Sequence, residues 1–395
     1  MVKNMITYEK ALEIVRAQSV LLGTERVDLH ESLNRVLRQD VASDMDMPPF
    51  DKSAMDGYAC RAEDARSVLE VIEVIPAGCQ PQHAIQANQC AKIMTGAILP
   101  QGADCVIPVE DVAVLSETKI RFQGERIAPN ICRRGEDVVA GQRLVSAGTR
   151  ITPKEIASFA LAGCSSPVVS RRPGVGIIAT GDEIVEPQVA PQRAQIRNSN
   201  SYQLYAQCLQ FGCRPYHLGI VKDTAEAIGG VVARAARQND LVLLTGGVSM
   251  GDFDLVPSLL KEAGFSILFE KVAIQPGKPT VFGRREDCFV FGLPGNPVSS
   301  FTVFEVLVKE LLSGLMGLRQ RAPTARFPLA KGFRRRAAER RAWVPVSITP
   351  DGLAEPVEYH GSAHITSLVS ADGLITVPIG EKVVPEGTLV DVRLL

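Results

Sequence analysis

The chain has 395 residues, of which 46% are hydrophobic and 22% are charged, and its formal net charge at pH 7 is -1. This length exceeds what a single hydrophobic core usually organises, so we expect roughly two to four domains in an ordinary soluble protein. The near-neutral charge gives no general attraction to nucleic acid or to an anionic membrane, and no apolar run is long enough to span a bilayer.

The nine cysteines are scattered along the chain, and none forms a Cys-x-x-Cys pair. The sequence therefore indicates neither a disulfide framework nor a zinc site. The first residues lack the uninterrupted apolar core of a secretory signal peptide. We therefore expect a protein of the reducing cytoplasm.

The N-terminal part predicts a helix and then a connecting segment. An amphipathic pattern starts the helix near Thr7, and a turn signal follows at Met47-Pro48-Pro49. From there to about residue 138, short strands such as Cys105-Val106-Ile107 alternate with turn residues, which predicts a compact β-rich domain. Thr152 and Pro153 then begin a second helix as its N-cap and first helical residue.

Residues 173–317 alternate strands with helices. The predicted strands are 175–179, 216–221, 241–244, 269–274 and 288–291. Between and after them, helices are predicted near 200–212, 225–237, 255–263 and 298–314. This rhythm implies a mostly parallel sheet with helices on both faces.

From about residue 320, short alternating strands return, with turn signals at Pro350-Asp351-Gly352 and Ala371-Asp372-Gly373. The predicted fold class is therefore multidomain α/β plus β, with a central doubly wound α/β domain, a β-rich insertion domain and a C-terminal β-barrel-like domain. The predicted domains are 1–45 with 139–172 (N-terminal and linker), 46–138 (β-rich), 173–318 (α/β) and 319–395 (C-terminal β).

The most informative segment is Leu243–Asp254, LLTGGVSMGDFD, where an apolar run opens into a glycine-rich turn. Bare backbone N–H groups in such a loop can hold phosphate oxygens, and Asp252 and Asp254 could hold a bridging Mg²⁺. Taken alone, the segment favours an ordinary strand-to-helix turn with capping aspartates.

Other predicted strands also end in polar residues. In open α/β sheets, ligands bind outside the carboxyl ends of the strands. Those ends carry Asp182, Glu183, Asp223, Asp252, Asp254, Lys278 and Asn296. Carboxylates combined with Mg²⁺ and exposed N–H groups suit a phosphoester or pyrophosphate, whereas each acid by itself is equally explained by helix capping.

Several common site types are not supported. Gly174-Val175-Gly176 lies at the start of a strand rather than after one, and neither a Walker-type phosphate loop nor a G-x-S-x-G elbow occurs. In the β-rich region, Pro49–Ala59 and Met94–Ala97 are typical of surface loops. Arg133–Asp137, RRGED, indicates a local ion-pair network.

Eight strings occur between residues 48 and 375: PPFDKSAMDGYA, IMTGAILPQGADCVIPVED, RRGEDV, ATGDEI, LTGGVSMGDFD, QPGKP, FGLPGNPVSS and, more weakly, GSAHITSLVSADGLI. Together they resemble the molybdopterin molybdenumtransferase family, MoeA, whose relatives include the E domain of gephyrin. The strings stand in family order, and several are long and nonrepetitive.

The resemblance implies an elongated protomer of four domains that forms a homodimer, with a MogA-like, molybdopterin-binding α/β domain. It implies a Mg²⁺-dependent reaction of adenylylated molybdopterin with molybdate, in which the phosphoanhydride is cleaved, AMP leaves and molybdenum stays on the dithiolene. The implied cleft lies where the α/β and C-terminal domains of one subunit meet the β-rich domain of the other. A contact with the molybdopterin adenylyltransferase is a further expectation, and neither nucleic acid nor membrane is an expected partner.

The resemblance also assigns residues. The expected catalytic residues are Asp56, Thr95, Asp137, Glu183, Asp223 and Asp254, and the last three are the expected Mg²⁺ ligands. The expected substrate-binding residues are Gly246, Gly247, Ser249, Lys278, Pro294, Gly295, Asn296, Ser299 and Ser362. Lys278, Ser299 and Ser362 are expected near the oxyanion, because molybdate is a dianion that suits lysine and hydroxyl donors.

The chain departs from the family pattern at three positions. Asn is usual where Lys52 stands, Lys is usual at Gln275, and Arg is usual at Pro345. The last two departures remove positive charge near the expected molybdate pocket, and losing such charge-assisted bonds costs roughly 1.5–3 kcal/mol each. We therefore expect weaker molybdate binding. The basic residues Arg334–Arg336 with Arg340 and Arg341 could compensate, although such runs usually form solvated faces.

Two alternative functions remain open at this point. The chain could be a catalytically weak or inactive paralogue that binds molybdopterin or partner proteins, which the three departures favour. It could also transfer an adenylyl group to molybdopterin, because the α/β domain is shared with enzymes of that activity. The extra β domains speak against the second alternative.

Overall fold

The computed structural model describes residues 5–246, 256–319, 323–358, 361 and 363–395. Contacts divide the chain into two compact units, which we call unit 1 and unit 2. Unit 1 comprises Met1–Gln39, Gly148–Thr152 and Val168–Leu395, and unit 2 comprises Asp40–Ala147 and Pro153–Pro167. No helix in the described ranges has both the length and the apolar character to cross a membrane.

Unit 1 is built on a six-stranded sheet of order β16-β13-β17-β21-β20-β18. The first four strands in this order run parallel to one another. The strand β20 runs antiparallel to β21, and β18 runs antiparallel to β20. The bounds are β13 Gly174–Thr180, β16 Arg214–Val221, β17 Leu241–Thr245, β18 Ser266–Phe269, β20 Val281–Arg285 and β21 Cys288–Leu293. The predicted mostly parallel sheet is confirmed, and β20 is a strand that the sequence pattern did not predict.

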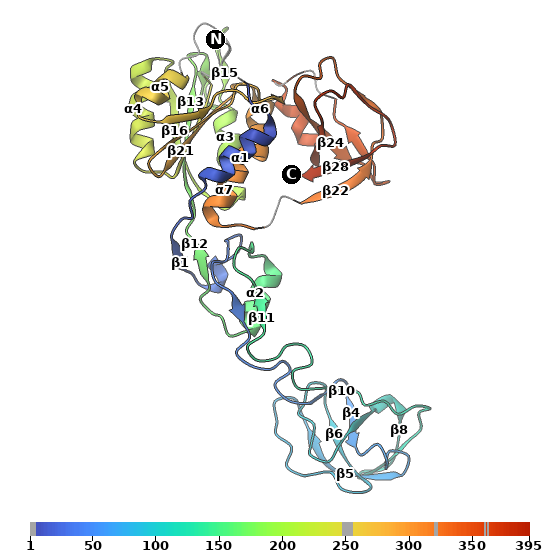
Figure 1. The fold of residues 1–395 in the computed structure, drawn as a ribbon. Coiled ribbons are helices and arrows are strands. Elements are labelled where there is room, and N and C mark those ends of the chain that lie inside the picture. Colours follow the sequence, from blue (N-terminus) through green and yellow to red (C-terminus); the bar gives the residue numbers. More distant parts are fainter. Residues whose placement is uncertain (1–4, 247–255, 320–322, 359–360, 362) are drawn as a thin grey trace. The chain divides into compact units, whose positions relative to one another are not determined.

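Helices cover both faces of this sheet, as predicted (Figure 1). On one face lie α1 (Tyr8–Gln18), α3 (Asn200–Gln210), α6 (Pro297–Val303), the π-helical turn η3 (Phe304–Val308) and α7 (Lys309–Met316). On the other face lie α4 (Ala225–Ala236) and α5 (Val256–Glu262). Along β13, Ile177 packs into the first core and Ile178 into the second, since successive strand residues point to opposite faces. Burial on both faces explains why these strands are almost continuously apolar.

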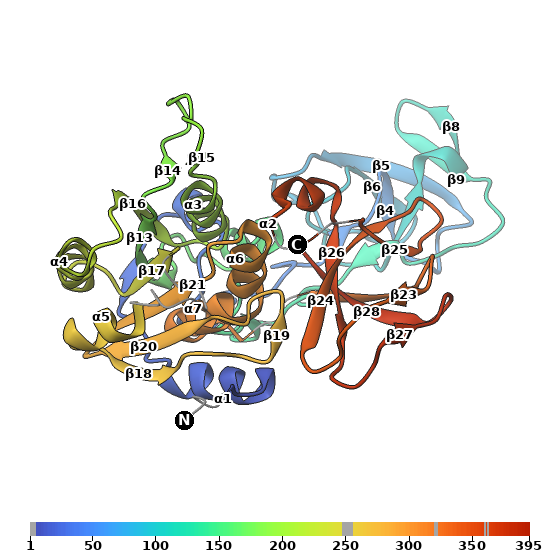
Figure 2. The ribbon, with the colours of Figure 1, turned by 90° about the horizontal axis from the view of Figure 1, so that it is seen from above.

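A second sheet in unit 1 is formed by the C-terminal part of the chain, beside the α/β sheet (Figure 2). Its order is β19-β24-β26-β28-β22, and β25 pairs with β24. The bounds are β19 Ile274–Gln275, β22 Thr324–Pro328, β24 Arg341–Ile348, β25 Ala354–Pro356, β26 Gly373–Val377 and β28 Leu389–Leu394; β23 (Phe333–Arg334) pairs with β27 (Val383–Val384), and η4 spans Ile365–Ser370.

The single strand predicted at 269–274 is wrong, because the segment divides between the two sheets of unit 1. β18 ends at Phe269 in the α/β sheet, and β19 begins at Ile274 and pairs with β24 of the C-terminal sheet. Trp343 and Leu374, from β24 and β26, also belong to the main core of the α/β sheet. The α/β and C-terminal parts of unit 1 therefore share buried side chains.

Unit 2 contains the predicted β-rich region as a six-stranded sheet of order β7-β4-β6-β5-β9-β8. Its strands are β4 Gly57–Cys60, β5 Val68–Ile75, β6 Gln89–Ile93, β7 Cys105–Pro108, β8 Val112–Ser116 and β9 Lys119–Phe122. The pairs β3 (Lys52–Ser53) with β10 (Ile131–Cys132) and β2 (Val41–Ala42) with β11 (Arg143–Val145) complete its strands. The helix α2, Pro153–Leu161, begins at the predicted proline.

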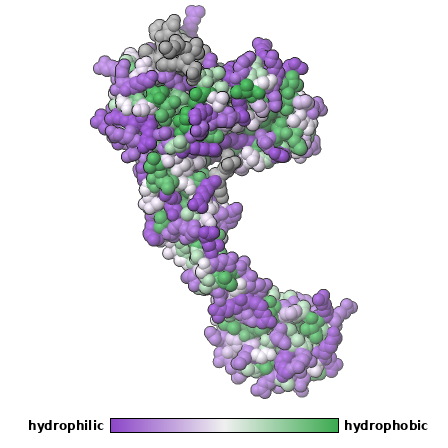
Figure 3. All heavy atoms as spheres, viewed as in Figure 1, coloured by the Kyte–Doolittle hydropathy of each residue, from purple (hydrophilic) through white to green (hydrophobic). Residues whose placement is uncertain are grey.

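Further short elements lie in unit 1. β1 (Thr24–Arg26) pairs with β12 (Val168–Ser170), and β14 (Ile184–Val185) pairs with β15 (Ile196–Arg197) in an excursion between β13 and α3. The predicted N-terminal helix is confirmed, because Thr7 caps α1 by accepting a hydrogen bond from the Lys10 backbone N–H at 3.2 Å. Polar residues cover much of the surface in the face shown in Figure 3, with apolar residues interspersed.

Substituting Phe291→Ala tests whether the central strands carry the stability of unit 1. Phe291 is 0% exposed and stacks on Phe282 with ring centroids 4.6 Å apart, so its loss should destabilise unit 1 by about 3–5 kcal/mol. Val369→Ala is the control, because that side chain is 86% exposed and should change the free energy of unfolding by less than about 0.5 kcal/mol. Denaturant unfolding followed by the fluorescence of Trp343, the single tryptophan of the chain, reports on this core. Equal effects of the two substitutions would contradict this description of the core.

Candidate functional site

Four parallel strands of unit 1 end in register at one edge of the sheet. Thr180 at the end of β13 is aligned with Val221 of β16, and Thr245 at the end of β17 is aligned with Leu293 of β21. The chain runs from β13 outward to β16 and then crosses to β17 on the other side of β13. Such a reversal of strand order opens a crevice between two neighbouring strands, which is where open α/β sheets bind ligands.

A cavity of about 710 Å³ lies at this edge, and we call it the strand-end cavity. Its walls come from the ends of β13, β17 and β21, the β14–β15 excursion, the start of α3, and residues of the QPGKP segment and η4. Its volume lies in the range of sites that bind small molecules, about 300–1,000 Å³. Among the residues that sequence analysis assigned to a site, those that line it are Glu183, Gly246, Pro294, Gly295 and Asn296.

Backbone packs closely on backbone at the floor of this cavity. Gly246 has a φ of +95°, and a Cβ there would lie 2.1 Å from the carbonyl oxygen of Thr180. At Gly295, a Cβ would lie 3.7 Å from the Cα of Gly246, so the turns after β17 and β21 leave room for little more than a methyl group between them. Glycine at 246 is therefore required both by the left-handed conformation and by the space available.

One asparagine joins the two turns. Asn200, the first residue of α3, donates through Nδ2 to Thr245 Oγ1 at 2.9 Å and to the carbonyl of Gly295 at 2.7 Å. Its Oδ1 is buried without a hydrogen-bond partner in the described structure, and the same holds for Thr180 Oγ1. Both residues line the strand-end cavity. Buried polar atoms are almost always satisfied, so these two acceptors indicate a place where a ligand or water completes the hydrogen bonding.

Sequence analysis missed Asn200, Thr245 and Thr180 as site residues. Asn200 is predicted only as the start of a helix near 200–212, and the two threonines only as residues that follow predicted strands. The available signal was a hydroxyl residue at the end of each of two neighbouring parallel strands. The bridge from Asn200 to Thr245 joins residues 45 positions apart, and local sequence contains no information about such a contact.

The three predicted Mg²⁺ ligands have different surroundings. Glu183 is exposed and lines the strand-end cavity. Asp223 follows β16 at the same edge and is exposed, but in the described structure it does not line the cavity. Asp254 lies outside the described residues, as do Asp252, Gly247, Ser249 and Ser362.

The donor set allows a test of whether Mg²⁺ fits. No group of three or more His, Cys, Asp or Glu side chains within the described ranges is placed to hold a metal ion. Protein sites for Mg²⁺ usually supply only one or two carboxylates and leave other positions to water and substrate phosphate. Glu183 beside the unpartnered acceptors of Asn200 and Thr180 is compatible with such a shared site.

Lys278 and Ser299 do not line the strand-end cavity in the described structure. Lys278 is half-buried and precedes Pro279, which does line it. Ser299 lies in the first turn of α6 and is buried. Asn296 is the N-cap residue of α6, so the start of that helix faces the cavity with Pro297.

In unit 2, two of the three predicted residues lie together. Asp56 Oδ1 accepts hydrogen bonds from the Thr95 backbone N–H at 2.7 Å and from Thr95 Oγ1 at 2.8 Å. These bonds, first the backbone one, lower the pKa of Asp56 below its ordinary value. Asp137 is exposed, and no hydrogen bond or ion pair of its side chain is found among the described residues.

The predicted ion-pair network around the RRGED segment is confirmed. Arg133 Nη1 lies 2.6 Å from Asp51 Oδ2, and Arg134 Nε lies 2.6 Å from Asp46 Oδ2. Backbone N–H groups of Arg134 and Ala140 also donate to these two carboxylates at 2.8 Å. The backbone bonds are the largest cause of the lowered pKa values of Asp51 and Asp46.

The departures from the family pattern have specific locations. Pro345 is buried in β24, opposite Leu374 of β26, and Gln275 is half-buried in β19. The prediction of a solvated basic face is wrong for Arg335, which is 8% exposed. Its guanidinium donates to the backbone carbonyls of three residues, Pro378, Arg340 and Glu381. The Arg335 guanidinium therefore stabilises the local backbone and is not available to bind an anion.

Known families match three parts of the chain. Residues 6–163 match the MoeA N-terminal region (domain I and II), residues 176–314 match a probable molybdopterin binding domain, and residues 328–395 match the MoeA C-terminal region (domain IV). The strand-end cavity is formed by residues of the second and third of these regions.

Individual proteins match over nearly the whole chain. A Bacillus subtilis protein named molybdopterin molybdenumtransferase is 36% identical over 389 residues, which are 94% of this chain and 90% of that protein. One of the same name from Staphylococcus epidermidis is 34% identical over 99% of this chain and 96% of its own. A crystal structure of a molybdopterin biosynthesis MoeA protein from Pyrococcus horikoshii covers 99% of both chains with a TM-score of 0.80 and 32% identity.

Substituting Gly246→Ala tests the close approach at the cavity floor. The added Cβ would clash with the Thr180 carbonyl oxygen. We therefore expect the free energy of unfolding to fall by about 1–3 kcal/mol more than it does when alanine replaces a glycine of positive φ that has open space around it. Gly352→Ala is the matched control: its φ is +75°, a Cβ added there would meet nothing within 4 Å, and it should lose about 1–2 kcal/mol. The measurement is denaturant unfolding by Trp343 fluorescence, and equal losses would show that the approach is not close.

Substituting Thr95→Val tests the contact in unit 2. Removing the hydroxyl donor should raise the pKa of Asp56 partway toward its ordinary value, while the Thr95 backbone bond persists. Because the pKa of Asp56 is lower in the folded state, its stabilising contribution is present above the ordinary pKa and is lost as pH falls through the folded one. Carboxyl ¹³C NMR titration measures the shift, and Thr118→Val, at an exposed position, should leave it unchanged.

Proposed function

Since the chain belongs to the MoeA family of molybdopterin molybdenumtransferases, which act in molybdenum cofactor biosynthesis, we propose the reaction that it carries out. It takes adenylylated molybdopterin and molybdate, cleaves the phosphoanhydride, releases AMP and leaves molybdenum on the dithiolene. Mg²⁺ assists the reaction. The observation that carries this proposal is the strand-end cavity, where three strand ends, two unpartnered acceptors and one carboxylate meet.

The strand-end cavity has the features needed to hold a nucleotide-linked anion. The helix α3 begins at Asn200 and α6 begins after Asn296, and both of these residues line the cavity. Backbone N–H groups at the start of a helix attract negative charge and hydrogen-bond phosphate oxygens. The turn at Gly246 brings further backbone close to the ligand because it has no side chain. We therefore assign the phosphoanhydride to this edge of the sheet.

Asn200 positions the ligand in this proposal. Its amide nitrogen is fixed by Thr245 and Gly295, so its Oδ1 is held in one orientation within the cavity wall. That oxygen, with Thr180 Oγ1, accepts hydrogen bonds from donors of the substrate or from its ordered water. An acceptor that is fixed before the substrate arrives loses less conformational entropy on binding.

Phosphoanhydride cleavage depends mainly on positioning and on neutralising charge. Glu183 is proposed to hold Mg²⁺ at the cavity, with Asp223 and Asp254 as the further ligands. When bound, the ion would neutralise charge on the phosphate oxygens. Lys278 and Ser299 are proposed to bind molybdate, since a cation and a hydroxyl donor suit a dianion.

A second candidate function is a paralogue that binds molybdopterin or partner proteins with little or no turnover. Gln275 and Pro345 favour it, because neither supplies the positive charge that is usual at these positions in the family. Arg335 cannot replace that charge, because three backbone carbonyls already occupy its guanidinium. Losing two charge-assisted bonds of roughly 1.5–3 kcal/mol each would weaken molybdate binding by at least about a hundredfold.

Three further proposals come with this function. The chain is proposed to form a homodimer, to contact the molybdopterin adenylyltransferase that supplies its substrate, and to work in the cytoplasm. Sedimentation equilibrium of the purified chain tests the first. A monomer at micromolar concentration would contradict the proposed homodimer.

The decisive experiment follows AMP release from adenylylated molybdopterin by the intact chain. The reaction is run with and without molybdate, and with Mg²⁺ or with a chelator. We expect AMP only in the presence of Mg²⁺, and faster release with molybdate. Tight binding of the substrate without AMP at millimolar molybdate would favour the non-catalytic paralogue instead.

Substituting Asn200→Ala should lower kcat/KM for AMP formation about fivefold to tenfold, because one fixed hydrogen-bonding group is lost. Asn239→Ala is the matched control. Asn239 also donates to a backbone carbonyl, that of Ala235 at 2.9 Å, but it precedes β17 and so lies at the opposite edge of the sheet. If both variants lose activity equally while remaining folded, Asn200 has no specific role in substrate binding.

A further inference from the structure

A second cavity, of about 590 Å³, lies elsewhere in unit 1, and we call it the arginine cavity. It is bounded by α1, the C-terminal end of α3, α7, β28 and the segment Gly148–Thr152, and its described lining shares no residue with the strand-end cavity. Five basic and two acidic residues line it: Arg16, Arg150, Lys309, Arg319, Arg393, Glu305 and Glu310. The side chains of the described lining therefore carry a formal excess of three positive charges, five minus two.

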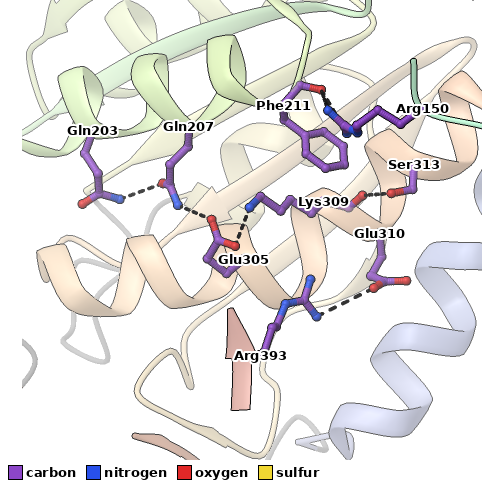
Figure 4. A network of polar contacts seen from close by, with 9 residues as sticks. All are labelled: Arg150, Gln203, Gln207, Phe211, Glu305, Lys309, Glu310, Ser313 and Arg393. Atoms are coloured by element: carbon purple, nitrogen blue, oxygen red, sulfur yellow. Dashed lines mark hydrogen bonds and ion pairs between the residues drawn. The ribbon is translucent and has the colours of Figure 1, made fainter. Parts of the chain in front are cut away.

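Two of these basic residues have acidic partners of their own. Lys309 Nζ lies 2.6 Å from Glu305 Oε2, and Glu305 Oε1 accepts from Gln207 Nε2 at 2.8 Å (Figure 4). Arg16 Nη2 lies 2.7 Å from Glu310 Oε2. Both carboxylates of the cavity are thus already engaged in close pairs.

The other three basic residues are not neutralised in this way. Arg393 Nη1 lies 3.9 Å from Glu310, and its Nε is buried without a hydrogen-bond partner in the described structure. The Arg150 guanidinium donates to the carbonyl of Phe211 at 3.5 Å and lies 4.7 Å from the centroid of the Phe211 ring (Figure 4). No acidic side chain among the described residues lies within ion-pair distance of Arg150 or Arg319.

The positions of these arginines are constrained by packing. Arg150 is half-buried, and burial lowers its pKa from the ordinary arginine value. The side chain of Arg319 lies over Gly148, where a Cβ would be 2.6 Å from Arg319 Cγ. Stacking on Phe211 accounts for Arg150 alone, but it does not account for Arg319 or for the unpartnered Nε of Arg393.

Arg150 and Arg393 are partly removed from water, and such guanidinium groups need an anion to offset the lost hydration, whereas Arg319 adds an exposed positive charge at the rim. A planar guanidinium can donate two parallel hydrogen bonds to a pair of phosphate oxygens. The carboxylate of Glu310 is already paired with Arg16, so it does not satisfy these donors. The volume of the arginine cavity exceeds that needed for one ion and lies in the range of small-molecule sites. The combination of three under-neutralised guanidiniums and one cavity therefore specifies the chemistry of a ligand.

We propose that the arginine cavity is a second binding site of this chain, for a small molecule that carries a phosphate or pyrophosphate group. Arg150, Arg319 and Arg393 hold the anion, and the Phe211 ring supports Arg150. The site is independent of the proposed reaction, because its residues do not line the strand-end cavity.

The test is calorimetric titration of the intact chain with inorganic pyrophosphate. Arg319→Gln should weaken binding at the arginine cavity about tenfold or more, because a charge-assisted contact is lost. Arg150→Gln should do the same. Arg121→Gln is the charge-matched control, since Arg121 is exposed on β9 in unit 2, and it should leave binding unchanged.

Binding to the strand-end cavity is distinguished by the pattern across variants. If pyrophosphate binds only there, all three arginine variants bind like the parent chain, and the proposal is overturned. Arg319 is exposed and makes no ion pair among the described residues, so its variant keeps the test valid if Arg150→Gln unfolds. A crystal of the intact chain grown with pyrophosphate should show density between Arg150 and Arg393, and an empty cavity at saturating pyrophosphate would also overturn the proposal.

Discussion

The parallel alignment of β13, β16, β17 and β21 is the constraint on which the rest of unit 1 depends. Because their hydrogen-bonded registers end together, the residues after each strand are delivered to one edge of the sheet. The strands are buried on both faces, so their direction is fixed by two cores at once. A shift of one residue in the register of any strand would exchange the side chains that face the two cores. The register is therefore fixed, and the turns that follow the strands are held at fixed positions.

That closeness decides what the strand-end cavity can do. The turn at Gly246 lies against Thr180, and Asn200 ties the turns after β17 and β21 together. The described part of the wall is therefore mainly a set of fixed backbone groups with two unpartnered acceptors. Such a wall suits a ligand with many polar groups, because affinity then comes from many oriented hydrogen bonds. In the proposed reaction, the positive charge for molybdate comes from other residues, so the lack of a cation at Gln275 and Pro345 bears on the affinity for molybdate.

The two cavities of unit 1 differ in electrostatic character. Among the described residues, the strand-end cavity is lined by one carboxylate, Glu183, one guanidinium, Arg197, and neutral residues, whereas the arginine cavity has an excess of guanidinium charge. A buried polar chain starts from the arginine cavity: Lys309 binds Glu305, Glu305 binds Gln207, and Gln207 binds Gln203 (Figure 4). Gln203 and Gln207 belong to α3, whose first residue is Asn200. The helix α3 therefore carries residues near both cavities. Glu305 lies in η3, the π-helical turn between α6 and α7.

The sequence by itself determined the family and most of the elements, with β20 and the segment 269–274 as exceptions. Apolar runs such as 241–244, helix signals such as Thr7 and Pro153, and the long motifs were sufficient, because each is a local pattern of residue types. The edge at which Glu183, Gly246 and Asn296 meet also followed, because parallel strands must deliver their ends together. Only the tertiary structure decided that segment 269–274 divides between two sheets, that Arg335 is buried, and that Asn200 bridges Thr245 and Gly295. Each of these depends on contacts between residues tens of positions apart, and their energies are set by packing and burial that a local sequence pattern does not contain.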